Sequence, residues 1–503
     1  MAQLRKNILA NFSGQGWAAL MQIVFIPFYV KFLGIEAYGL IGFYAMLQGI
    51  LQILDFGLSP TMTRELARFS AVANNSNQIR SFVRTLESVY WSIGIVIGLI
   101  IYATAPFIAH SWITASFLDS STVEQSIRLM GIIAALQWPL SFYQGGLMGL
   151  ERLVLLNAVK IGNSTVFGAG AIVVLAFISP NIVAFLTWQV GMSAIQLAVV
   201  TFCLWKSLPR SETLPRFDKQ VFLNIRRFAT GMTGIMVSAI IVSQVDKLIL
   251  SRLLPLESFG YYTLAYVVSS GLLLSILPVF NALFPRFSAI AATGNEGELS
   301  RLYHLGTQFT ASLLFPMAAI LVLFSNDILL IWTGNVITAN NAAPIACCLV
   351  VGTALNGLMY PVTALQLANG WTSIGLRINL SFVALIIPGI MMMTAWYGAV
   401  GAASVWAALN GVYVLATVPL THRRLLKGQA RRWFSQDVGI VFLMVLSLSL
   451  VARSIVVSPL HPVSGAILLV GVFVILFTAA IFAAPALRPM AIDFITRRVT
   501  KHA

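Results

Sequence analysis

The chain has 503 residues, of which 58% are hydrophobic and only 9% are charged. Soluble domains typically carry about 25% charged residues, so this sequence is not that of a soluble globular protein. The net charge of +15 lies mostly in short loops between hydrophobic segments, which argues against a nucleic-acid partner. Composition therefore predicts an all-α polytopic membrane protein.

Hydrophobic runs long enough to cross the ~30 Å hydrocarbon core recur along the whole chain. The N-terminal run is too long for the apolar part of a signal peptide, so we expect it to form the first membrane helix. In chain order, we expect fourteen transmembrane helices at residues 8–32, 37–60, 86–109, 123–148, 155–178, 181–205, 228–253, 259–284, 303–325, 341–367, 373–394, 398–421, 437–457 and 463–484.

Basic residues alternate between successive loops. If the N-terminus is cytoplasmic, the two termini and every second loop hold most of the 31 lysines and arginines. The opposite loops hold only Lys31 and Arg252. A wrong helix count would destroy this alternation, so the pattern predicts that both termini are cytoplasmic. The cytoplasmic loop residues are Arg64, Arg68, Arg80, Arg84, Arg152, Lys206, Arg210, Arg216, Lys219, Arg226, Arg227, Arg286, Arg301, Arg423, Arg424, Lys427, Arg431 and Arg432.

Three motifs of the first half recur in the second half. PLSFYQGGLMGLERLVLLN (139–157) matches PVTALQLANGWTSIGLRIN (361–379) at an offset of 222 residues, or 221 for the glycines Gly149 and Gly370. KFLGIEAYGL likewise matches SRLLPLESFGYY 221 residues later, and ARFSA echoes PRFSA. A unit of six helices is even, so both copies face the same way, as in a parallel repeat. We expect two pseudo-symmetric six-helix lobes followed by two additional C-terminal helices.

The repeat sets the expected domain boundaries. They are an N-lobe at 1–205, a cytoplasmic linker at 206–227, a C-lobe at 228–425, the two additional helices at 426–486 and a basic cytoplasmic tail at 487–503.

Some of these phrases resemble a known family. The stretches LGIEAYGLIGFYAMLQGILQILDFGLSPTMTRELAR, SQVDKLILSRLLPLESFGYYTLAY and GLERLVLLN are similar to the corresponding parts of O-antigen (Wzx-type) polysaccharide flippases. That family belongs to the multidrug/oligosaccharidyl-lipid/polysaccharide exporter superfamily. The resemblance extends over nearly the whole chain, although no motif identifies the sugar.

The resemblance implies a transporter rather than an enzyme. It would move undecaprenyl-diphosphate-linked oligosaccharide units from the cytoplasmic to the periplasmic leaflet of a bacterial inner membrane by alternating access, for O-antigen, capsule or exopolysaccharide synthesis. Membrane lipids and the polysaccharide polymerase machinery are the other expected partners. One alternative is a cation-coupled multidrug exporter, which usually has twelve spans. Lipid II flippases usually carry arginines in the first helix. This sequence has none there, which argues against that family.

No Walker sequence, glycine-rich phosphate loop or Ser/His/Asp set occurs in the sequence, so we expect no cofactor. Cys203, Cys347 and Cys348 lie in apolar runs, and no Cys/His spacing indicates a metal site. The five histidines lie at or near span ends, where we expect interfacial positions; they are His110, His304, His422, His461 and His502.

A diphosphate can cross the membrane only in a wet, cationic cavity, so basic residues inside spans are candidates for substrate binding. Lys160 and Arg377 lie at comparable depths in the fifth and eleventh spans, with Lys160 ~12 Å beyond Arg152. We expect this pair to bind the diphosphate, and snorkelling to the interface is the alternative. Arg128 and Lys247 are further candidates, although Arg128 follows Glu124 by four residues, a spacing that favours a local ion pair.

Asp246 and Lys247 lie side by side within an apolar run, where an ionised group costs at least ~3 kcal/mol at the bilayer centre. Neighbouring residues of a helix point about 100° apart, so the two need not pair. Relatives are thought to use a carboxylate in the seventh helix for H⁺ or Na⁺ coupling. The resemblance therefore makes Asp246 the candidate for ion coupling, with Asn379 as a polar neighbour; a structural ion pair is the alternative. For Asp55 we expect a role at a helix end.

Overall fold

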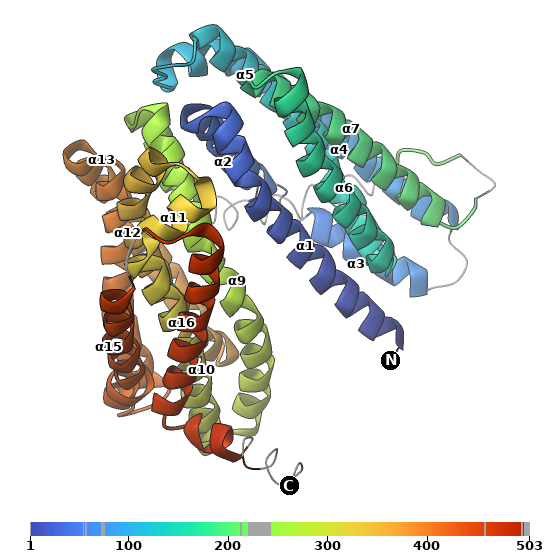
Figure 1. Cartoon of the computed structure of the whole chain (residues 1–503). Helices are drawn as coiled ribbons and strands as arrows, with labels where there is room; N and C mark the ends of the chain where they lie inside the picture. The colour runs from blue at the N-terminus through green and yellow to red at the C-terminus, as the bar shows by residue number, and fades with distance from the viewer. Residues whose placement is uncertain are drawn as a thin grey trace. The chain divides into compact units, whose positions relative to one another are not determined.

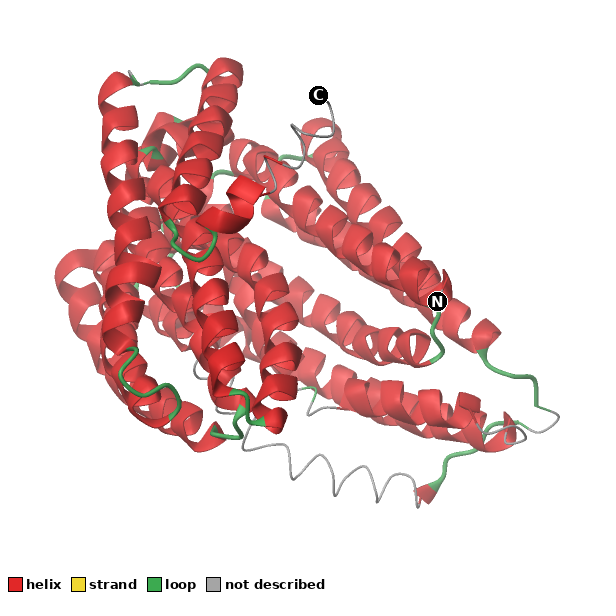
Figure 2. Cartoon of the chain, turned by 90° about the horizontal axis from the view of Figure 1, so that it is seen from below, coloured by secondary structure: helices red, strands yellow, loops and turns green. Residues whose placement is uncertain are grey.

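The computed structural model describes residues 2–53, 55, 58–71, 76–211, 214–219, 243–456, 459–493 and 496. Within these ranges the chain is helical apart from loops and one isolated β-bridge between Thr114 and Pro255 (Figure 2). Ten of the described helices are long and apolar enough to cross a membrane. The all-α membrane fold is confirmed. The number fourteen stays a prediction, because residues 220–242, in the predicted linker and seventh span, lie outside the described ranges.

The chain divides into two compact units, Met1–Gly260 and Tyr261–Ala503. In the first unit, α4 packs on α5, α5 on α7 and α1 on α6. These are the blue to green helices in Figure 1. Its elements are α1 (Ala2–Leu33), α2 (Ile35–Ile53), α3 (Leu58–Ala71), α4 (Ser76–Phe107), the π-helix η1 (Ile108–Trp112), α5 (Ser120–Gly149), α6 (Leu153–Val173), the π-helix η2 (Val174–Ile178) and α7 (Ile182–Ser207), followed by helical residues 243–253.

Small residues bring α4 and α5 together. A Cβ atom on Gly98 would lie 2.7 Å from the Cβ atom of Ala135 and 2.9 Å from the carbonyl oxygen of Gly131. Close backbone approach increases the van der Waals contact between membrane helices. This contact stabilises helix pairs because lipid tails are as apolar as the side chains, so burying apolar surface alone gains little. Aromatic side chains fill the adjacent core, where the ring centroids of Tyr90 on α4 and Phe142 on α5 lie 5.0 Å apart.

The predicted second span is too long. α2 ends at Ile53, and the predicted loop that follows contains the additional helix α3. Asp55, in the turn between them, accepts a hydrogen bond of 2.9 Å from the backbone N–H of Ser59 in the first turn of α3. The carboxylate thus satisfies one of the unpaired donors at a helix N-terminus. Its expected helix-end role is confirmed.

In the second unit, α12 packs on α13 and α10, while α15 and α16 pack on each other and on α10. Asparagine caps begin both α10 and α12, since Asn295 accepts from Glu298 N–H and Asn335 from Thr338 N–H. The elements are α9 (Leu256–Thr293), which begins in the first unit, α10 (Glu296–Leu323), α11 (Ser325–Thr333), α12 (Val336–Ala368), α13 (Thr372–Arg424), α14 (Ala430–Arg432), the π-helix η3 (Trp433–Gly439), α15 (Ile440–Ile455) and α16 (Pro462–Ala483).

α13 contains both the predicted eleventh and twelfth spans. At 1.5 Å per residue, a straight helix of this length would measure roughly 80 Å, far more than the bilayer thickness. The non-helical backbone at Gly398 (φ 57°, ψ −141°) divides it into two arms. A Cβ atom on Gly401 would contact the carbonyl oxygen of Met393, so the chain folds back at this point. Glycine is favoured there because other residues rarely adopt positive φ.

The motifs around Gly39 and Gly260 lie against each other. A Cβ atom on Gly39 would meet the carbonyl oxygen of Leu256, and a Cβ atom on Gly260 would meet that of Ile35. Both pairs are related by the offset of 221 residues, so the two contacts are reciprocal. We call this the glycine contact. Glu36, also part of the motif, accepts hydrogen bonds from the backbone N–H groups of the loop at 116–118.

The turn after α5 repeats after α12, but in a different register from the sequence match. The Arg152 N–H donates to Leu147 O, as the Trp371 N–H does to Gln366 O. The left-handed residues of the two turns are Glu151 (φ 56°) and Gly370 (φ 69°), a pattern typical of a Schellman motif. The offset is therefore 219 here, so the expected pairing of Gly149 with Gly370 is wrong by two residues.

Replacing either glycine of the contact with alanine is expected to destabilise the protein by about 1–3 kcal/mol, because the new methyl group meets backbone atoms that cannot rotate away. Thermal unfolding of purified Gly39→Ala and Gly260→Ala would measure the loss. Gly191→Ala on α7 is the matched control, since no atom lies within 4 Å of its Cβ position. Unfolding temperatures equal to that of the control would contradict the packing described here.

Candidate functional site

The two predicted diphosphate ligands lie near the starts of their helices. Lys160 is half-buried on α6, eight residues after Arg152, and Arg377 is exposed on α13, six residues after Trp371. In the register of the two turns, Lys160 therefore corresponds to Asn379, two residues from Arg377. Their depths differ by only ~3 Å, but two helical residues rotate by roughly 200°. The cations are thus at similar depth on different faces of equivalent helices.

Arg377 lies at an apolar cavity of about 350 Å³ between the two arms of α13, which we call the α13 groove. Its walls include Phe382, Leu385 and Leu420. Trp371 also lines the groove and is stacked by Arg424, whose guanidinium carbon lies 4.5 Å from the ring centroid. The groove thus combines a cation with an alkyl-lined wall, as binding of an anionic lipid headgroup and its chain requires.

The ion pair expected between Arg128 and Glu124 is confirmed, with a guanidinium–carboxylate distance of 2.5 Å. His110 lies 3.4 Å from the same carboxylate, and the Arg128 guanidinium stacks over Tyr102 at 5.2 Å. Because the guanidinium already has these partners, its predicted role in substrate binding would require the pair to open.

Asp246 and Lys247 pair with each other, as in the structural ion pair given above as the alternative. Lys247 Nζ lies 3.3 Å from Asp246 Oδ1, and the side chains are only 11% and 18% exposed, respectively. Pairing lowers the cost of holding both groups in an apolar helix. Asn379 is a residue of α13, but its side chain lies outside the part of the chain that the structure describes.

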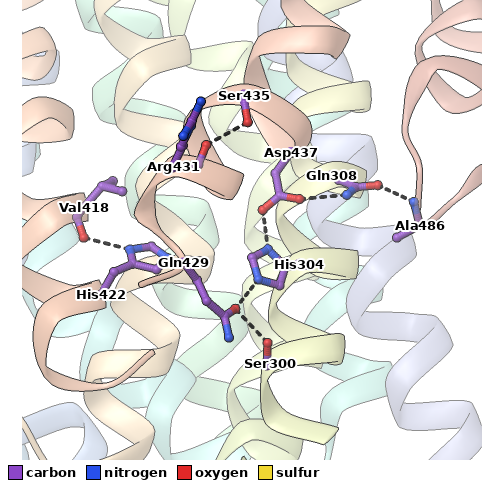
Figure 3. Close-up of polar contacts among 10 residues, drawn as sticks. All are labelled: Ser300, His304, Gln308, Val418, His422, Gln429, Arg431, Ser435, Asp437 and Ala486. Carbon is purple, nitrogen blue, oxygen red and sulfur yellow. Dashed lines mark hydrogen bonds and ion pairs between the residues drawn. The ribbon is translucent and has the colours of Figure 1, made fainter. Parts of the chain in front are cut away.

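A buried polar network in the second unit joins α10 to η3 (Figure 3). His304 Nδ1 contacts Asp437 Oδ2, and its Nε2 contacts the amide oxygen of Gln429. Gln308 donates to Asp437 Oδ1 at 2.7 Å, and Ser300 donates to Gln429 at 2.7 Å. Both imidazole nitrogens face oxygen atoms, so the ring bridges the Asp437 carboxylate and the Gln429 amide.

The same network reaches the C-terminal segment, because Gln308 Oε1 accepts a hydrogen bond of 2.7 Å from the backbone N–H of Ala486. His304 and His422 are each only 1% exposed, so the expected interfacial position is wrong for both. His422 Nδ1 lies 2.7 Å from the carbonyl oxygen of Val418, and its ring packs against Tyr303. Polar residues four apart within an apolar span, as His304 and Gln308 are, could have indicated a buried network.

Comparison with known proteins places this fold among membrane transporters. A family described as "Polysaccharide biosynthesis protein" matches residues 4–291. A protein of Shigella flexneri named "Putative O-antigen transporter" is 24% identical over 406 residues, which cover 80% of this chain and 94% of that protein.

Two solved structures share the fold. The lipid II flippase MurJ in an inward closed conformation has a TM-score of 0.67 at 14% identity, covering 95% of this chain and 98% of its own. An inward-facing multidrug resistance MATE family transporter has a TM-score of 0.67 at 13% identity, covering 82% of this chain and 96% of its own. The pseudo-symmetric transporter fold expected from the repeat is thereby confirmed.

The buried network generates a stability prediction. His304→Leu is expected to cost about 1–3 kcal/mol or more, because it leaves the buried Asp437 carboxylate with one hydrogen-bond partner fewer. The double variant His304→Leu/Asp437→Leu should recover much of that loss, as measured by thermal unfolding of the purified protein. His110→Leu is the control, since the side chain of His110 is 56% exposed and a surface pair contributes about 1 kcal/mol or less. A double variant less stable than His304→Leu would contradict this interpretation.

Proposed function

The chain belongs to the polysaccharide biosynthesis protein family, and from this we propose that it is a flippase for lipid-linked oligosaccharides. It would transfer undecaprenyl-diphosphate-linked repeat units from the cytoplasmic to the periplasmic leaflet for O-antigen, capsule or exopolysaccharide synthesis. The name of its Shigella flexneri relative supports the same substrate class.

The observation that carries the proposal is the extent of the fold match. The lipid II flippase covers 95% of this chain, whereas the MATE transporter covers 82%. Nearly the whole chain, including the two additional C-terminal helices, thus fits a flippase better than a multidrug exporter. Within this fold, the buried network fastens η3 and the segment after α16 to α10.

The intramembrane cations support a diphosphate as the transported charge. Lys160 and Arg377 lie close to the cytoplasmic ends of their helices under the predicted orientation, where the substrate is made. The α13 groove places an apolar wall beside Arg377. A lipid diphosphate matches this combination, because its charge needs a cation while its chain needs an apolar surface.

The protein is a multi-pass membrane protein, and we propose that it lies in the bacterial inner membrane with both termini cytoplasmic. Asp246 is the proposed site of H⁺ or Na⁺ coupling, with Lys247 as its counter-charge and Asn379 as a polar neighbour. The polysaccharide polymerase would take up the transported unit at the periplasmic face.

Deleting the gene is expected to abolish one surface polysaccharide and to leave its lipid-linked precursor in the cytoplasmic leaflet. Complementation with Lys160→Ala or Arg377→Ala should restore export about ten- to a hundredfold less well than the parent chain, because a charge-assisted contact to the diphosphate is lost. Surface polysaccharide and trapped precursor would be quantified together. Lys206→Ala, an exposed lysine after the predicted sixth span, is the control. Full export by both charge-neutral variants would remove the role proposed for this pair.

Asp246→Asn is expected to abolish the response of transport to an imposed H⁺ or Na⁺ gradient. The amide keeps the shape of the side chain, but it cannot bind and release H⁺ and has no negative charge to attract Na⁺. Precursor transport into proteoliposomes would be compared with and without each gradient. Asp246→Glu should retain the response, and Asp119→Asn, in an exposed loop, should behave as the parent does. If Asp246→Asn still followed the gradients normally, coupling through this residue would be wrong.

A further inference from the structure

A polar recess of about 180 Å³ lies between α2 and α5 in the first unit. It contains four glutamines but no lysine or arginine among the described residues that line it. The glutamines are Gln48, Gln52, Gln137 and Gln144, and Leu51 and Trp138 lie beside them. Gln52 is exposed and the other three glutamines are half-buried, two on α2 and two on α5. In an apolar bundle such amides need hydrogen-bond partners, either from the protein or from a molecule in the recess.

Two of the glutamines are held in place by the protein. Gln48 Nε2 donates to the Tyr44 hydroxyl at 2.7 Å and contacts Gln137 Oε1. Gln137 in turn donates to the Ser193 hydroxyl at 3.1 Å. These bonds link α2, α5 and α7 and give the recess a fixed polar wall.

Asp55, the one carboxylate among the described lining residues, is surrounded by neutral donors. Tyr90 donates to it at 2.6 Å, and Ser59 donates through both its backbone N–H at 2.9 Å and its hydroxyl at 3.0 Å. The Ser141 hydroxyl lies 3.4 Å from Asp55 Oδ1, the oxygen to which Tyr90 and the Ser59 hydroxyl also donate. These donors take up most of the lone pairs of the carboxylate, so it does not need a cation as partner.

Three other lining groups have no partner within the described part of the chain. The Trp138 residue is 6% exposed, and its indole N–H is buried without an acceptor there. Gln52 and Gln144 make no side-chain hydrogen bond within that same part. Each amide offers donors and an acceptor, and the indole offers one donor. The recess therefore presents unused hydrogen-bonding groups of both kinds, together with an aromatic side chain.

We propose that this recess binds one sugar ring of the transported oligosaccharide, an inference that rests on the proposed flippase function. Sugar hydroxyl groups both donate and accept, as the glutamine amides do, and the C–H face of the ring matches an aromatic side chain. The recess excludes the diphosphate, because no cation lines it to offset the desolvation of phosphate. Substrate recognition is thus divided between a neutral sugar subsite on α2 and α5 and cations elsewhere.

The size of the recess fits this assignment. Its volume of about 180 Å³ gives room for one sugar ring, and the recess is open, so the remaining sugars can extend beyond it. The subsite therefore selects one ring, while the remaining sugars stay outside it.

The test uses the natural glycan without its lipid. Precursor that accumulates in the deletion strain is extracted, and mild acid releases its oligosaccharide from the lipid diphosphate. The purified full chain should bind this free oligosaccharide. Gln52→Leu/Gln144→Leu should weaken binding about tenfold or more, and Trp138→Phe about fivefold, because hydrogen bonds to hydroxyl groups are lost. Gln196→Leu on α7, outside the recess, is the matched control and should bind normally.

A second measurement keeps every polar group of the recess in place. Leu51→Cys places a thiol in the lining, in a chain whose Cys203, Cys347 and Cys348 are replaced with alanine. The free oligosaccharide should slow modification of this thiol by a maleimide, and undecaprenyl diphosphate without sugar should not. Protection by the sugar-free lipid instead would assign the recess to the diphosphate and overturn the proposal. Protection by an organic cation alone would overturn it in favour of a drug site.

Failure of the subsite and failure of the flippase give different results. If precursor accumulates but its oligosaccharide neither protects the thiol nor distinguishes Gln52→Leu/Gln144→Leu from Gln196→Leu, the subsite is wrong and the flippase stands. If the deletion strain accumulates no precursor, the proposed function fails and the subsite fails with it. Lys160→Ala separates the two roles further, since it should weaken binding of the complete precursor but not of the free oligosaccharide.

Discussion

Hydrocarbon cannot accept or donate a hydrogen bond, and this constraint decides where polar side chains lie in the chain. Asp437 lies fully buried only because His304 and Gln308 surround it. Asp55 is held by Tyr90 and Ser59 in the same way. Each polar group has its partner on another helix or one turn away, so the polar contacts also determine which helices stay together.

The recess is one of the places where the protein itself does not satisfy its polar groups. Gln52, Gln144 and the Trp138 indole are left for something else to satisfy, whereas the buried network in the second unit satisfies its members internally. The two polar clusters therefore differ in kind. One fastens helices to each other, and the other is open to a polar molecule that would be expensive to carry through lipid.

The sequence predicts the membrane fold, because hydropathy and charge alternation follow directly from the bilayer. It predicts the parallel repeat because three motifs recur at a nearly constant offset. Local contacts such as Arg128 with Glu124 are also predictable, since four residues separate them on one helix. The pairing of His304 with Asp437 is not, because the two residues lie 133 positions apart and only the packing of α10 against η3 joins them. The register of the turns at Glu151 and Gly370 is missed for a related reason. Backbone conformation, rather than the identity of the glycine, defines their equivalence.

The glycine contact has the form of an isologous interface, in which each of two like surfaces touches the other through the same atoms. Such an interface is closed, so it joins two like segments and leaves no surface for a third. Within one chain, the two copies of the repeat can differ at most other positions while these reciprocal contacts keep their local two-fold symmetry. Gly39, Ile35, Leu256 and Gly260 all lie within Met1–Gly260, so this unit expressed alone would keep both reciprocal contacts.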